Sequence, residues 1–78
     1  MPTVMRIGPY RFFYYSNESG EPPHIHVHRD SIKAKFWISP VSLASSTGFS
    51  AKELRELNRL VCENEQVFRS HWDEYFSD

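Results

Sequence analysis

Three histidines stand at every second position of the segment GEPPHIHVHRD, residues 20–30, with apolar residues between them. Imidazoles serve as metal ligands, as general acids or bases and as binding groups, so these residues are the strongest candidates for chemistry in the chain. Their alternation is typical of a β-strand, in which successive side chains point to opposite faces of the sheet. We therefore expect His24, His26 and His28 to share one face of a strand.

The segment IKAKFWIS, residues 32–39, alternates in the same way. Asp30 and Ser31 precede it and suit a two-residue hairpin turn. A hairpin closed there places His24 opposite Trp37, His26 opposite Lys35 and His28 opposite Lys33. The opposite face is largely apolar, and a slip of one residue would bury lysine there. The face that carries these six residues is called the histidine face below.

One hypothesis for the histidine face is a metal site. Two imidazoles at alternate strand positions have Cβ atoms about 6–7 Å apart and can converge on one ion, whereas the outer pair is about 13 Å apart. His24 and His26 form such a pair. A third ligand would come from the C-terminal helix, where His71, Asp73 and Glu74 are the candidates. The neighbouring lysines would repel a cation.

A second hypothesis is an RNA-binding or RNA-cleaving surface. Lysines beside the histidines would lower the pKa of the imidazoles and leave them mostly neutral at pH 7. Neutral imidazoles and Trp37 can stack on bases while Lys33 and Lys35 contact phosphates. In a ribonuclease, His24 or His26 would act as general acid or base.

A third hypothesis is a protein-binding face. One helix covers only one side of a small sheet, and uncovered aromatic residues surrounded by charge mark interaction sites. Trp37 would be joined there by residues of the preceding strand, either Tyr10, Phe12 and Tyr14 or Arg11, Phe13 and Tyr15. The alternative to all three hypotheses is a solvated strand whose polar positions happen to be histidines.

The elements that would position these residues begin with short strands. Four segments are rich in strand-forming residues or alternate in polarity, namely 3–7, 10–16, 24–29 and 32–39. Pro40 ends the fourth strand because proline cannot donate a hydrogen bond to the sheet. The following VSLASSTGF, residues 41–49, suits either a short edge strand or a loop.

A C-terminal helix follows from a capping box, with Ser50 as N-cap and Glu53 three residues later. Apolar and aromatic residues then recur at helical spacing. The stripe comprises Leu54, Leu57, Val61, Asn64, Phe68, Trp72 and Tyr75, widened by Leu60, Val67, His71 and Phe76. We expect one helix over residues 51–76, with a break near Asn64 as the alternative. The predicted fold is α+β, a small antiparallel sheet of about four strands with one long helix packed across one face.

Composition predicts one domain over residues 1–78, because 78 residues leave no room for a second core. The net charge of −1 favours neither nucleic acid nor membrane, although residues 1–40 carry +2 and residues 41–78 carry −3. Cys62 is the only cysteine, which suits a reducing compartment. With no long apolar run and no signal peptide, we expect a soluble cytoplasmic protein without membrane contact or cofactor.

Several stretches together resemble the bacterial family known as domain of unknown function 4160. They are RFFYYSNE, PPHIHV, KFW and GFSAKELREL, and the likeness runs nearly end to end. The residues that match the family pattern within the histidine strand are Pro22, Pro23, His24 and His26, whereas His28 is expected to vary. The resemblance implies a small cytoplasmic bacterial protein encoded beside a second small protein, in a toxin–antitoxin-like pair. It carries over no catalytic residues.

The leading hypothesis is therefore an interaction module of a toxin–antitoxin-like pair. It would bind a protein encoded nearby, through the histidine face or along a strand edge. The alternative is an RNA-binding or RNA-cleaving toxin that uses the same face. A metal-binding protein comes third, and whether the chain is an enzyme stays open. Self-association is a further option, because domains of this size are marginally stable.

Overall fold

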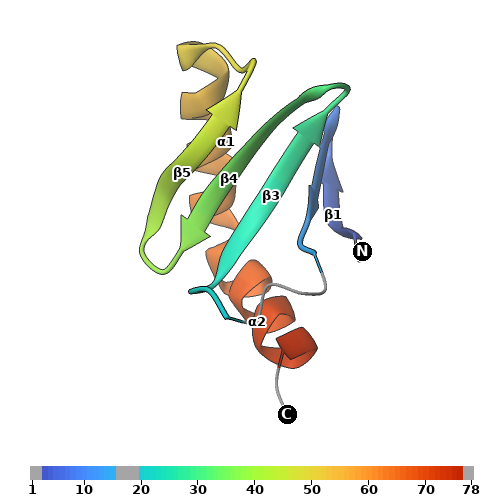
Figure 1. The fold of residues 1–78 in the computed structure, drawn as a ribbon, viewed down its shortest axis with the longest axis vertical. Helices are drawn as coiled ribbons and strands as arrows, with labels where there is room; N and C mark the ends of the chain where they lie inside the picture. The colour runs from blue at the N-terminus through green and yellow to red at the C-terminus, as the bar shows by residue number, and fades with distance from the viewer. Residues whose placement is uncertain (1–2, 16–19, 77–78) are drawn as a thin grey trace.

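The fold is a five-stranded antiparallel sheet in which each strand pairs with the next along the chain (Figure 1). The computed structural model describes residues 3–15 and 20–76. The strands are β1 (Thr3–Ile7), β2 (Tyr10–Phe13), β3 (His24–Arg29), β4 (Ile32–Ile38) and β5 (Val41–Thr47). The segment after Pro40, which the sequence left open as strand or loop, is thus the edge strand β5.

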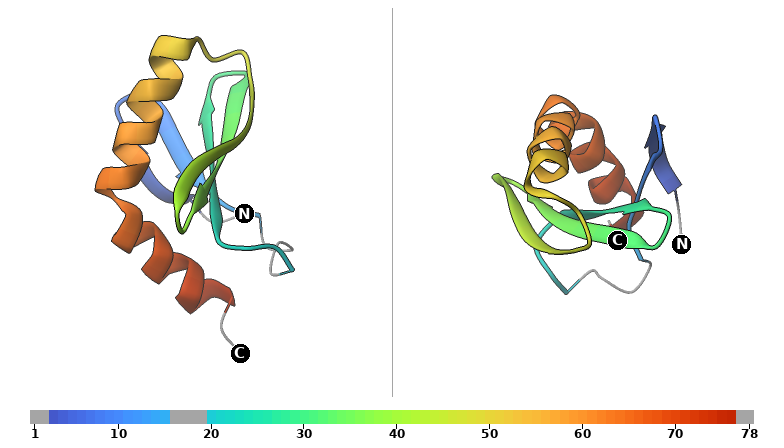
Figure 2. Two further views of the ribbon diagram at one scale, coloured as in Figure 1. Left: turned by 90° about the vertical axis from the view of Figure 1, so that its left-hand side faces the viewer. Right: turned by 90° about the horizontal axis from the view of Figure 1, so that it is seen from above.

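Two helices, α1 (Ala51–Glu63) and α2 (Glu65–Phe76), follow the sheet and lie on one of its faces (Figure 2). The predicted α+β class is confirmed, but the expectation of one uninterrupted helix is wrong. The chain leaves helical geometry at Asn64, where φ is −112° and ψ is 16°. The Asn64 side chain donates to the carbonyl of Leu60 at 2.9 Å, so it competes with the backbone at that turn. Neither described helix is long and apolar enough to cross a membrane.

The main core lies between the sheet and the two helices. Its fully buried side chains come from β2, β3 and β4 on one side and from α1 and α2 on the other. Phe12 of β2 stacks on Phe68 of α2 with ring centroids 5.2 Å apart. This contact packs β2 against α2.

The central residues of the predicted helical stripe are buried as expected, but several residues at its edges are exposed. Leu57, Val61 and Phe68 are fully buried. By contrast, Val67 is 42% exposed, Tyr75 is 44% exposed and His71 is also exposed. One reason is that α2 extends past the ends of the strands, so its last turns have less sheet to pack against (Figure 1).

Both edge strands contain a bulge. In β5, Leu43 lies opposite Phe36 and Ser45 lies opposite Lys35, which leaves one extra residue between them. In β1, the register shifts in the same way between Thr3 and Met5. Because of the β5 bulge, Leu43 points to the helix-covered face and Ser45 points to the histidine face.

Candidate functional site

The predicted register of the histidine hairpin is confirmed. His24 lies opposite Trp37, His26 opposite Lys35 and His28 opposite Lys33. Strand β2 continues the same face, since Phe13 pairs with His26 and Arg11 pairs with His28. Of the two sets of β2 residues left open by the sequence, the set with Arg11 and Phe13 is therefore the one on the histidine face.

His24 is fully buried, with no exposed surface. Its ring lies 4.9 Å from the ring of Trp72 in α2 and 5.7 Å from that of Trp37. Its Nδ1 atom is 2.9 Å from the carbonyl oxygen of Pro22. A carbonyl only accepts, so Nδ1 carries the proton and donates it. His24 therefore anchors α2 to the start of β3 and is out of reach of a partner or substrate.

The two prolines before His24 hold this anchor in place. The carbonyl of Pro22 orients the imidazole, and the carbonyl of Pro23 accepts a 3.1 Å hydrogen bond from the amide of Ile38. Proline fixes its own φ and restricts the residue before it, so the entry to β3 has few alternative conformations. The PPHIH pattern is explained by this local geometry without any ligand.

His26 and His28 pack around Phe13, which is completely buried although it lies on the face without helices. The ring of His26 stacks on Phe13 at 5.5 Å, and the ring of His28 meets it edge-on at 4.6 Å. Tyr15 closes the cluster, with its ring 5.3 Å from Phe13. The histidine face thus holds a small aromatic cluster of its own, and two histidines cover it.

The pKa of His28 lies below its usual value of 6.5. Burial is the largest cause, and the charges of Lys33, His26 and Arg11 add to it. Burial and nearby positive charge both disfavour the imidazolium, so His28 is neutral at pH 7. The sequence predicted this direction from the lysines, whereas burial against Phe13 is the stronger cause.

Lys35 interacts both with Trp37 and with the chain before β3. The ammonium of Lys35 is 2.6 Å from a carboxylate oxygen of Glu21 and 4.7 Å from the centre of the Trp37 ring. One face of the indole is therefore covered by a cation that is itself paired. Because of these contacts, the charge of Lys35 and the ring face of Trp37 are less available to an external ligand.

A shallow hollow of about 200 Å³ lies on the histidine face across β3, β4 and β5. Its lining includes His26, His28, Lys33, Lys35, Ser45 and Thr47. Hydroxyl and ammonium groups can donate to an anion or to a peptide carbonyl. Nothing in this geometry activates a nucleophile, so the hollow suits binding better than catalysis.

The candidate metal ligands are not brought together. Within residues 3–15 and 20–76, no three histidine, cysteine, aspartate or glutamate side chains form a group that could hold a metal ion. The rings of His24 and His26 are neighbours, 5.1 Å apart, but His71, Asp73 and Glu74 do not join them. The third ligand that the metal hypothesis requires is absent from this part of the chain.

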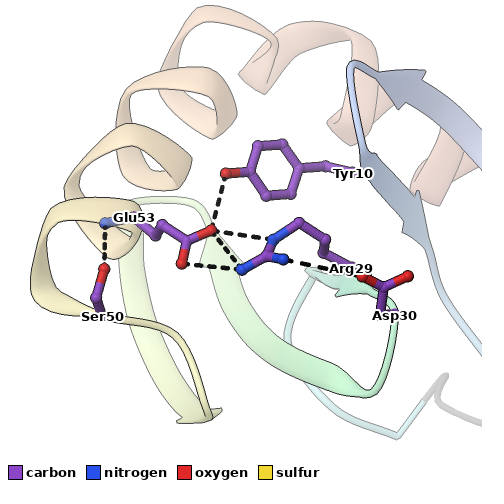
Figure 3. A network of polar contacts seen from close by, with 5 residues as sticks. All are labelled: Tyr10, Arg29, Asp30, Ser50 and Glu53. Atoms are coloured by element: carbon purple, nitrogen blue, oxygen red, sulfur yellow. Dashed lines mark hydrogen bonds and ion pairs between the residues drawn. The ribbon is translucent and has the colours of Figure 1, made fainter.

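A second polar centre, between β2, β3 and α1, was not recognised in the sequence (Figure 3). Glu53 accepts hydrogen bonds from Nε and Nη2 of Arg29, both at 3.0 Å, and from the hydroxyl of Tyr10 at 3.3 Å. Its own amide donates to Ser50 Oγ at 3.1 Å, as the predicted capping box requires. The capping pattern identified Glu53 but gave no sign of Arg29 or Tyr10.

This second centre connects α1 to strands β2 and β3. Burial raises the pKa of Tyr10, and the negative charge of Glu53 raises it further. The hollow of about 690 Å³ beside it is lined by both basic and acidic residues of α1, including Lys52, Arg55 and Glu56. Because Glu53 is already paired with Arg29, the centre has a structural role that needs no ligand.

Comparison with known proteins gives a family but no function. Residues 10–73 match the family described as Domain of unknown function (DUF4160). Neither the curated proteins nor the solved structures contain a significant match. The matched range includes β2 to β5, α1 and most of α2, and so most of the histidine face. The chain belongs to the DUF4160 family.

Proposed function

We propose that this chain is a protein-interaction module of a toxin–antitoxin-like pair, acting in the cytoplasm and binding its partner through the histidine face. One observation carries the proposal. Both helices lie on the opposite face, while the histidine face combines aromatic rings, cations and hydroxyls around a shallow hollow. Aromatic and cationic residues of this kind are enriched at interfaces.

The face is a better docking surface than either edge of the sheet. Edge strands invite pairing with another chain, and bulges are one of the devices by which proteins prevent it. Both β1 and β5 are bulged. A partner strand could pair with only a few residues on either side of each bulge.

Protein binding is also favoured over RNA cleavage. His24 is enclosed by Trp72 and Trp37 and cannot reach a substrate. One face of Trp37 is covered by Lys35, whose charge is paired with Glu21. Base stacking needs accessible ring faces, and general acid–base catalysis needs a group within hydrogen-bond reach of the reacting atoms.

Two tyrosine substitutions on β5 test the proposal. Ser45→Tyr adds a bulky neutral side chain on the histidine face, whereas Leu43→Tyr adds a similar ring on the opposite face of the same strand. Both positions are exposed, so neither change disturbs the core. Each variant is co-expressed with the protein encoded beside the gene and is captured through a tag on that protein.

We expect the wild type and Leu43→Tyr to be captured equally, and Ser45→Tyr to be captured at least tenfold less. Circular dichroism of both variants checks that the fold is retained. Equal capture of all three chains would exclude the histidine face as the docking surface. If the wild type is not captured, the protein encoded beside the gene is not its partner.

A further inference from the structure

One row of side chains crosses the whole sheet on the histidine face. Strand pairing places Arg6 opposite Arg11, Arg11 opposite His28, His28 opposite Lys33 and Lys33 opposite Thr47. Directly paired residues share a face and have Cβ atoms about 4.5–5.5 Å apart. The five residues Arg6, Arg11, His28, Lys33 and Thr47, one from each strand, are called the cationic row below. The row contains no acidic residue.

The positive charges of this row lack acidic partners in the part of the chain that the structure describes. Arg29 pairs with Glu53, and Lys35 pairs with Glu21. Arg11, by contrast, donates to the hydroxyl of Thr3 at 2.9 Å and lies over the ring of Phe13 at 4.6 Å.

Neither Arg6 nor Lys33 forms an ion pair with any described residue, and both are exposed. Like charges on neighbouring strand positions destabilise a sheet. The exposed charges of Arg6 and Lys33 therefore add no attractive ion pair to the part of the fold that the structure describes.

We propose that the cationic row binds the carboxylates of an acidic segment in a partner protein. This inference rests on the proposed function and specifies the chemistry of the partner. Lys33 and Thr47 both line the hollow of the histidine face. Lys33 supplies an ammonium group there, and Thr47 supplies a hydroxyl donor. Arg11 lies two strands away and supplies a guanidinium, and the backbones of the two strands are about 10 Å apart, which leaves room for two carboxylates.

A short acidic peptide fits this row better than a nucleic acid does. Nucleic-acid affinity comes from neutralising several phosphates along a track of cations. The cationic row has only three such charges, and the net charge of the chain is −1, so the row supplies a short basic track and not a long one. A local cluster of two or three carboxylates needs no extended basic surface.

The test uses a fluorescein-labelled hexaglutamate peptide, titrated with the full chain at low ionic strength and followed by fluorescence anisotropy. Lys33→Gln removes one charge of the row, and the double variant Lys33→Gln with Arg6→Gln removes two. Arg55→Gln is the matched control, because it removes one exposed charge from α1. We expect about three- to fivefold weaker binding for the single variant, about tenfold or more for the double variant, and no change for the control.

Three outcomes would overturn the inference. They are no saturable binding of hexaglutamate, an equal loss in Arg55→Gln, and tighter binding of a labelled hexauridylate RNA than of the peptide. A failure here is separate from a failure of the proposed function. If Ser45→Tyr blocks capture of the neighbouring protein while Lys33→Gln with Arg6→Gln does not, the docking face is right and the acidic partner is wrong.

Discussion

Glu53 joins three elements of the fold through its polar contacts. Its backbone amide donates to the N-cap residue Ser50, and its carboxylate joins the helix to Arg29 of β3 and Tyr10 of β2. The Arg29 and Glu53 side chains are 31% and 29% exposed, so the pair is only partly screened by solvent. A bidentate arginine–carboxylate contact of this kind also fixes the orientation of the two side chains.

Glu53→Gln should therefore lower the free energy of unfolding by about 1–2 kcal/mol. The substitution keeps the size of the side chain but removes the charge that binds Arg29. Urea denaturation at pH 7 measures the change. Glu56→Gln in the same helix is the control, because Glu56 forms its ion pair with the exposed Arg59, and loss of an exposed pair should matter much less. Equal effects of the two changes would contradict a structural role for the Glu53 centre.

His28 should make stability depend on pH. Its folded-state pKa is lowered by burial and by Lys33, His26 and Arg11. As the pH falls below about 6.5, the unfolded chain therefore takes up the proton before the folded chain does, and the fold loses stability. Above that pH both states are neutral at this position and the effect vanishes.

The His28→Gln variant should lose less stability than the wild type between pH 7 and pH 5. Urea denaturation at a series of pH values compares the two slopes. Identical slopes would show that His28 titrates alike in the folded and unfolded chains.

At the scale of elements, the connection between β5 and α1 is sterically constrained at Gly48. Gly48 has a φ of +97°, a backbone conformation that residues with a side chain rarely adopt. A Cβ atom built there would collide with Cγ2 of Ile32. The next residue, Phe49, enters the core beside it. The sequence marked this glycine only as part of an ambiguous segment.

Gly48→Ala should destabilise the protein by about 1–3 kcal/mol, from backbone strain together with the clash. Thermal unfolding followed by circular dichroism measures the effect. Gly20→Ala is the matched control, since a Cβ at Gly20 meets nothing within 4 Å. A loss in Gly48→Ala no larger than in the control would show that this joint can adjust.

At the scale of the whole molecule, aromatic clusters lie on both faces of the sheet. The main core lies under the helices, and the second cluster surrounds Phe13 on the histidine face. His24 links the two, because its ring contacts both Trp72 of α2 and His26. The Cα radius of gyration, 11.6 Å, is about that expected for one compact domain of this length.

The whole chain should therefore unfold in one cooperative step. Far-ultraviolet circular dichroism reports the helices and strands, and near-ultraviolet circular dichroism reports the packing of Trp37 and Trp72. The two signals should give coincident urea transitions. A histidine face that loosens before the helices unfold would separate the curves and contradict the prediction of a single domain.

The sequence by itself determined the features that depend on neighbouring residues. Alternation of polarity placed His24, His26 and His28 on one face, and the Asp30–Ser31 turn set the register with β4, because a strand has a period of two and a slip would bury lysine. The Ser50–Glu53 pattern located the start of α1 for a similar local reason. The break at Asn64 was only an alternative, and the bulge in β5 was not anticipated, since both depend on contacts that compete with regular hydrogen bonding.

Only the tertiary structure decided what each side chain on these elements contacts. His24 is buried because Trp72, nearly fifty residues later, packs against it. Glu53 meets Arg29 because α1 crosses the sheet beside the end of β3. The cationic row exists because five separate strands align in one register. The contacts of His24 with Trp72 and of Glu53 with Arg29 join residues far apart in the chain, and no local period or turn preference encodes them.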